Sequence, residues 1–125
     1  MTPETHALIG TGVLVLSLIV GVWAVLAGKR SKTANPWLTS ALAVTMVLLG
    51  VQILAGIDLL ARGGRPAPGI LAVVHVGGPV IAFILGLWAL LGTPRAQIRR
   101  YILADHLTFL AALVSYVIGE AFKAR

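Results

Sequence analysis

The sequence predicts an all-α integral membrane protein, a single transmembrane domain over residues 1–125 folded as a four-helix bundle. Of its 125 residues 58% are hydrophobic and only 11% are charged, and the mean hydropathy is +0.97. A membrane-spanning helix needs roughly 20 apolar residues, so the chain has room for four spans and little else. We expect helices over about 3–27, 37–60, 69–91 and 101–122.

Capping signals mark the starts of the first two helices. Thr2-Pro3-Glu4 precedes the first, where threonine caps the N-terminus, proline suits the first turn and glutamate favours the positive helix end. No basic segment or cleavage site accompanies the first apolar run, so we expect a retained helix and not a signal peptide. Asn35-Pro36 starts the second helix, and Trp37 is an interfacial anchor.

A loop rich in glycine, proline and arginine, residues 62–69, joins the second and third helices. Pro68 suits the first position of the third helix. Pro79 lies inside that helix and removes the hydrogen bond to the carbonyl four residues earlier, which belongs to His75. We therefore expect a kink beside this histidine. A second proline-containing turn, residues 93–95, ends the helix.

The net charge of +6 resides in the loops, where basic residues set topology and meet anionic lipid headgroups. No basic helix face carries interleaved aromatic residues, so nucleic-acid binding is not expected. The positive-inside rule predicts both termini outside the plasma (inner) membrane. The basic residues of the predicted inner face are Lys29, Arg30, Lys32, Arg95, Arg99 and Arg100, and those of the outer face are Arg62, Arg65, Lys123 and Arg125.

The two halves of the chain resemble each other, which suggests a parallel duplication of a helix hairpin. Residues 21–30 match residues 86–95 around a shared Gly-x-Trp-Ala segment, and each segment follows a histidine, His6 or His75, near the start of its helix. Repeats of this kind occur in membrane proteins. Apolar helices also align easily by composition alone, and that alternative stays open.

His6 and His75 are the candidate metal ligands. Both lie in the outer half of the predicted topology, on parallel helices, and their depths differ by about one helical turn, roughly 6 Å. An ionisable residue inside a membrane span predicts a functional site. Two imidazoles that face each other across a bundle core suit the iron of haem b. Each histidine also has an alternative interpretation. His6 could be a solvated residue at the membrane interface, and His75 could be a hydrogen-bonded residue of the core.

Small residues adjoin both histidines, with Gly10 one turn after the first and Gly78 close to the second. They would let a flat porphyrin lie against the backbone, although small residues equally allow close helix packing. Arg62 and Arg65 are the expected contacts of a haem propionate, because guanidinium binds carboxylate bidentately.

Other polar residues have simpler interpretations. We expect Asp105 to pair with Arg99 or Arg100, and Asp58 to pair with the arginine four residues later. His106 lies nearer the inner face, and its functional alternatives are a second cofactor ligand or a quinone contact. The sequence contains no cysteine, phosphate loop or zinc-ligand spacing, and no nucleophile with an adjacent base, which disfavours an enzyme.

The segment Gln52-Ile-Leu-Ala-Gly-Ile57, the proline-containing outer loop and His75 resemble one four-helix half of the heme A synthase family. The segment His6-Ala-Leu-Ile-Gly10 resembles that family's other ligand helix. The resemblance implies haem b held by histidines on two helices. No arginine follows either histidine, and the chain has one half and no cysteine pair. The resemblance therefore implies a small b-type cytochrome and not the synthase reaction.

The sequence thus predicts a membrane electron-transfer protein or cytochrome subunit of a larger respiratory or photosynthetic complex. The alternative is a cofactor-free accessory subunit that packs against such a complex or binds lipid or pigment. A small transporter is a third alternative.

Overall fold

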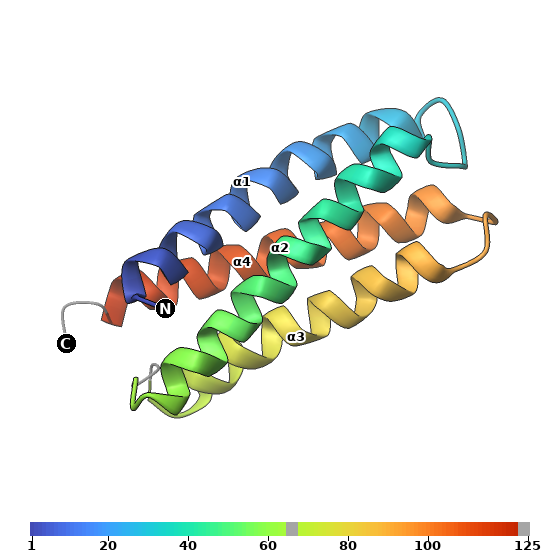
Figure 1. Ribbon diagram of the computed structural model, residues 1–125. Coiled ribbons are helices and arrows are strands. Elements are labelled where there is room, and N and C mark those ends of the chain that lie inside the picture. The colour runs from blue at the N-terminus through green and yellow to red at the C-terminus, as the bar shows by residue number, and fades with distance from the viewer. Residues whose placement is uncertain (65–67, 123–125) are drawn as a thin grey trace.

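The computed structural model describes residues 1–64 and 68–122, which form four long helices joined by short loops (Figure 1). All four are long and apolar enough to cross a membrane. This confirms the predicted all-α bundle of membrane-spanning helices. The helices are α1 Pro3–Gly28, α2 Pro36–Ala61, α3 Ile70–Leu91 and α4 Gln97–Phe122.

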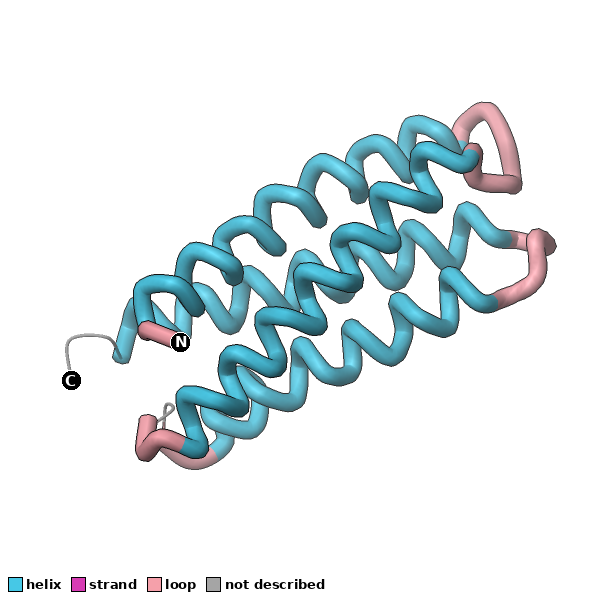
Figure 2. Tube along the Cα trace, viewed as in Figure 1, coloured by secondary structure: helices cyan, strands magenta, loops and turns pink. Residues whose placement is uncertain are grey.

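Each helix runs antiparallel to the one before it, as Figure 2 shows. Both α1 and α3 pack against α2 and α4, so α1 and α3 are parallel and lie diagonally across the bundle. We call the end where α1 and α3 begin the histidine end. The opposite end, formed by the loops 29–35 and 92–96, is the basic end. Trp23 and Trp88 both lie near the basic end, as the predicted duplication requires, and the duplication itself stays a prediction.

Every helix turns one apolar stripe inward and leaves its other faces exposed. The outward side chains are mostly large and apolar, and Leu8, Leu54 and Leu91 are each more than two-thirds exposed. Such a surface suits lipid and not water. The buried core comprises Val13, Val20, Ala24, Leu38, Leu42, Met46, Leu49, Ala82, Ala89, Ile98, Tyr101 and Ala104.

The first two helices begin at the predicted caps. The Thr2 hydroxyl accepts a hydrogen bond from the Thr5 amide at 3.2 Å. The Asn35 side chain accepts one from the Leu38 amide at 2.8 Å. Each bond satisfies an amide that the helix itself leaves without a partner. These residues therefore fix where α1 and α2 start.

The starts of α3 and α4 differ from the prediction. The third helix begins at Ile70 after Gly69, whose φ of +60° interrupts the helical backbone, so Pro68 is not its first residue. The fourth begins at Gln97 and not at about Tyr101. Its inward stripe already starts at Ile98, which is 4% exposed, and the arginines that follow occupy its first turns.

Candidate functional site

His6 lies on the inward face of α1 at the histidine end and is half-buried. Its Nε2 is 3.2 Å from the side-chain amide nitrogen of Gln52 on α2. With the amide in this orientation, Gln52 donates and His6 accepts at Nε2. Gly56 of α2 packs beside this ring, where a Cβ would lie 3.4 Å from the His6 Cε1.

His75 lies on the inward face of α3 and is also half-buried. Pro79 leaves the His75 carbonyl without its usual partner within the helix. The hydroxyl of Ser115 on α4 donates to that carbonyl oxygen at 3.3 Å. The side chain of a neighbouring helix thus replaces the hydrogen bond that proline removes, and α3 continues through Pro79 as one helix.

The two imidazoles lie at the same end of the bundle, on the diagonal helices α1 and α3. In each ring Nδ1 is buried and lacks a hydrogen-bond partner within the described chain. The side-chain oxygen of Gln52 is also buried and also lacks a hydrogen-bond partner among the described residues. A buried polar atom without a partner costs free energy. The site therefore combines two nitrogen bases on diagonal helices with unsatisfied hydrogen-bonding capacity.

Two histidine nitrogens are the ligands that a bis-histidine haem requires. The space beside the two rings, however, is partly filled by side chains. The clearance at Gly10 is taken by Gln52, whose amide nitrogen lies 2.9 Å from where a Gly10 Cβ would be. On the other side, an apolar groove of about 240 Å³ between α3 and α4 runs beside Gly78 and is lined by Val74 and Ala111. A macrocycle held by both histidines would therefore require Gln52 to turn away from His6.

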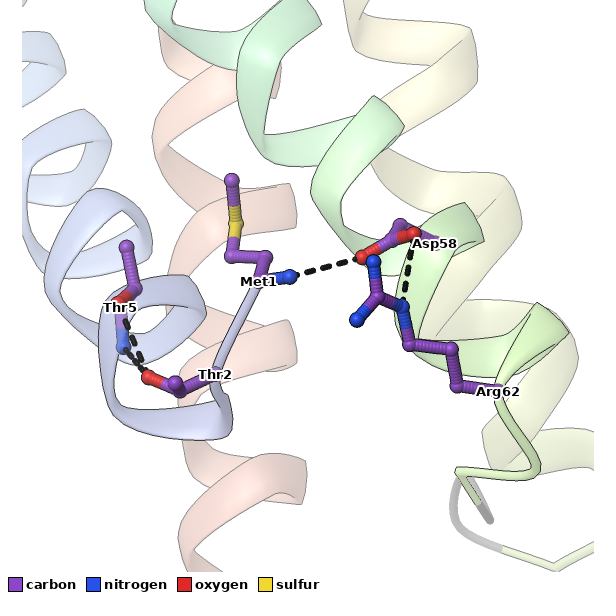
Figure 3. Close-up of polar contacts among 5 residues, drawn as sticks. All are labelled: Met1, Thr2, Thr5, Asp58 and Arg62. Carbon is purple, nitrogen blue, oxygen red and sulfur yellow. Dashed lines mark hydrogen bonds and ion pairs between the residues drawn. The ribbon is translucent and has the colours of Figure 1, made fainter.

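A charged cluster joins α1 to α2 at the same end (Figure 3). The Asp58 carboxylate lies 3.0 Å from the Met1 amino group and 3.0 Å from Arg62 Nε. The predicted pairing of Asp58 with Arg62 is therefore confirmed, and the chain terminus is a further partner. Arg65, the other expected propionate contact, lies outside the described residues.

The predicted pairing of Asp105 with Arg99 or Arg100 is wrong. Asp105 is 1% exposed and points into the core against Gly21 of α1. Neither carboxylate oxygen has a hydrogen-bond partner in the described part of the chain. Arg100 instead donates to the carbonyl oxygens of residues 93 and 95. The reason is helical spacing, since only residues three or four apart share a helix face.

His106 lies on an exposed face of α4 in the half nearer the basic end. Its Nδ1 donates to the Ile102 carbonyl oxygen at 2.7 Å. Because the other two histidines lie at the histidine end, the structure does not bring His106 together with them. It is therefore an unsuitable ligand for a group held between His6 and His75.

Gln52 and Ser115 are site residues whose contacts with the two histidines the sequence did not predict. A signal exists for Gln52, because it continues the inward spacing of Leu42, Thr45 and Leu49 on α2. Ser115 belongs to a polar and small stripe on α4 at helical spacing. Comparison with protein-family models, curated proteins and solved structures finds no match to this chain.

Proposed function

We propose that this protein binds one haem b between His6 and His75 and serves in electron transfer within the plasma (inner) membrane. One observation carries the proposal. Two half-buried imidazoles lie on diagonal helices at the same end of the bundle, each with a buried nitrogen lacking a partner among the described residues. Cofactor sites in helical bundles are built from such facing side chains.

The contact between His6 and Gln52 supports a ligand role. When Nε2 accepts the Gln52 amide hydrogen, its lone pair points toward α2. Gln52 holds this lone pair by one hydrogen bond, which ligation would replace. When bound, haem b would supply reversible one-electron chemistry, and His6 and His75 would hold its iron.

The surroundings assign supporting roles to other residues. Arg62 uses Nε for Asp58, and its side chain is otherwise exposed at the histidine end. We propose that its remaining guanidinium donors bind a propionate. Ser115 positions His75 through the carbonyl bond described above. The exposed apolar faces of the helices suit lipid, and we propose that part of this surface contacts a larger respiratory or photosynthetic complex.

A reduced-minus-oxidised absorbance spectrum of the purified protein tests the proposal. We expect a b-type haem spectrum that His75→Ala and His6→Ala abolish or alter. His106→Ala is the matched control and should leave the spectrum unchanged, because His106 lies in the other half of α4. Preparations without haem absorbance under all conditions would refute haem binding and favour the cofactor-free accessory subunit.

A further inference from the structure

A cavity of about 580 Å³ lies at the basic end, between the last turns of α1 and the loop that leads to α2. Trp23 and Leu26 form an apolar wall. Lys29 and Arg30 supply positive charge, and the hydroxyl of Ser31 is polar lining. The cavity therefore joins an apolar side and a cationic side within one space.

The loop that forms the cavity is fixed in place by α4. The amide of Ile98 donates to the Lys32 carbonyl oxygen at 3.1 Å. The amide of Ala34 donates to the Gln97 side chain at 3.0 Å. Within the loop, the Ser31 hydroxyl accepts from the Thr33 amide at 3.1 Å. These bonds fix the backbone of the loop before a ligand binds.

The charge around the cavity favours an anion. The chain has four acidic residues. Glu4 and Glu120 belong to helix turns at the histidine end, as does the ion-paired Asp58. Asp105 is buried in the core. The basic end therefore presents its lysines and arginines without acidic neighbours, and its potential is positive.

The apolar wall identifies the kind of anion. Trp23 is 37% and Leu26 is 55% exposed, on the lipid-facing side of α1. Tryptophan at a helix end favours the membrane interface. A free inorganic anion would use the cations and leave this wall uncovered. A phospholipid would use both, through its phosphate and the start of its acyl chains.

We propose that this cavity binds the headgroup of an anionic glycerophospholipid. The phosphate contacts Lys29 and Arg30, and the glycerol backbone and upper acyl chain pack on Trp23 and Leu26. Basic pockets at the membrane surface recognise such headgroups. This site lies at the opposite end of the bundle from the histidines and is independent of haem binding.

Fluorescence quenching of Trp23 tests the proposal. The variant Trp37→Phe/Trp88→Phe leaves Trp23 as the reporter. It is placed in phosphatidylcholine vesicles that contain increasing mole fractions of either brominated phosphatidylglycerol or brominated phosphatidylcholine. We expect the brominated anionic lipid to quench Trp23 at severalfold lower mole fraction. Lys29→Gln and Arg30→Gln should each weaken this preference about fivefold, the effect of one basic residue near a charged surface.

Arg99→Gln is the matched control, because Arg99 is an exposed cation of the same end that does not line the cavity. It should leave the preference unchanged. Equal quenching by both lipids would overturn the proposal. An equal loss of the preference in Arg99→Gln would also overturn it, because it would indicate diffuse electrostatic attraction to the whole basic end. A loss of the preference on adding inorganic phosphate would overturn it as well, because it would indicate a site for the free anion.

Discussion

At the scale of single residues, the most unusual feature is a carboxylate in the bundle core. Asp105 is 1% exposed, and its oxygens have no hydrogen-bond partner in the residues described. Gly21 makes room for it, because a Cβ at that position would lie 2.5 Å from Asp105 Oδ2. Gly21 of α1 and Asp105 of α4 therefore pack against each other, and a larger residue at position 21 would collide with the carboxylate.

We expect Gly21→Ala to lower the free energy of unfolding by about 1–3 kcal/mol, the usual cost of overpacking a core. In an Asp105→Ala background the same change should cost much less, because the colliding oxygen is gone. Unfolding in detergent micelles measures both values. Gly119→Ala, where a Cβ meets open space, should not be destabilising. Equal costs of Gly21→Ala in the two backgrounds would contradict this pairing.

At the scale of elements, α3 depends on α4 to tolerate its internal proline. Pro79 deprives the His75 carbonyl of its partner, and the Ser115 hydroxyl replaces it at 3.3 Å. The same bond couples the position of the histidine to the neighbouring helix. The packing of α3 against α4 therefore contributes to the site as well as to the bundle.

We expect Ser115→Ala to cost about 0.6 kcal/mol, the average for hydrogen bonds between membrane helices. In a Pro79→Ala background the cost should nearly vanish, because the new amide at position 79 can donate to the His75 carbonyl. A double-mutant cycle of unfolding free energies measures the coupling. Additive effects of the two substitutions would show that Ser115 does not act through this carbonyl.

The elements could be predicted from sequence because membrane helices need long apolar runs and because Thr2 and Asn35 are strong caps. That His6 and His75 lie at the same end of the bundle could be predicted from their positions on parallel helices. The bond from Gln52 to His6 could not, because it depends on how α2 is rotated about its axis. Asp105 was misassigned because Arg99 and Arg100, which lie six and five residues before it, do not share its helix face.

At the scale of the whole molecule, the two ends of the bundle differ in chemistry. The histidine end carries the imidazole pair and the ion-paired Asp58. The basic end carries Lys29, Arg30 and the cavity beside them. An asymmetry of this kind orients a protein in the membrane, because basic loops stay on the cytoplasmic side.

We expect the basic end inside and both termini outside. A membrane-impermeant thiol reagent on intact cells should label Ala61→Cys, and it should label Ser31→Cys only after permeabilisation. Both positions are exposed and at opposite ends. Ala61 is preferable to Gly64, where a Cβ would lie 2.7 Å from the Leu59 carbonyl oxygen. The reverse labelling pattern would invert the proposed orientation.

The shared ligation by His6 and His75 is tested most directly by electron paramagnetic resonance of the oxidised protein. Two imidazole ligands leave the iron six-coordinate and low-spin. The proposal predicts a low-spin haem signal in the unaltered protein, and its replacement by a high-spin signal or its loss in both His6→Ala and His75→Ala. A high-spin signal in the unaltered protein, or a low-spin signal that survives in either variant, would contradict ligation by this pair.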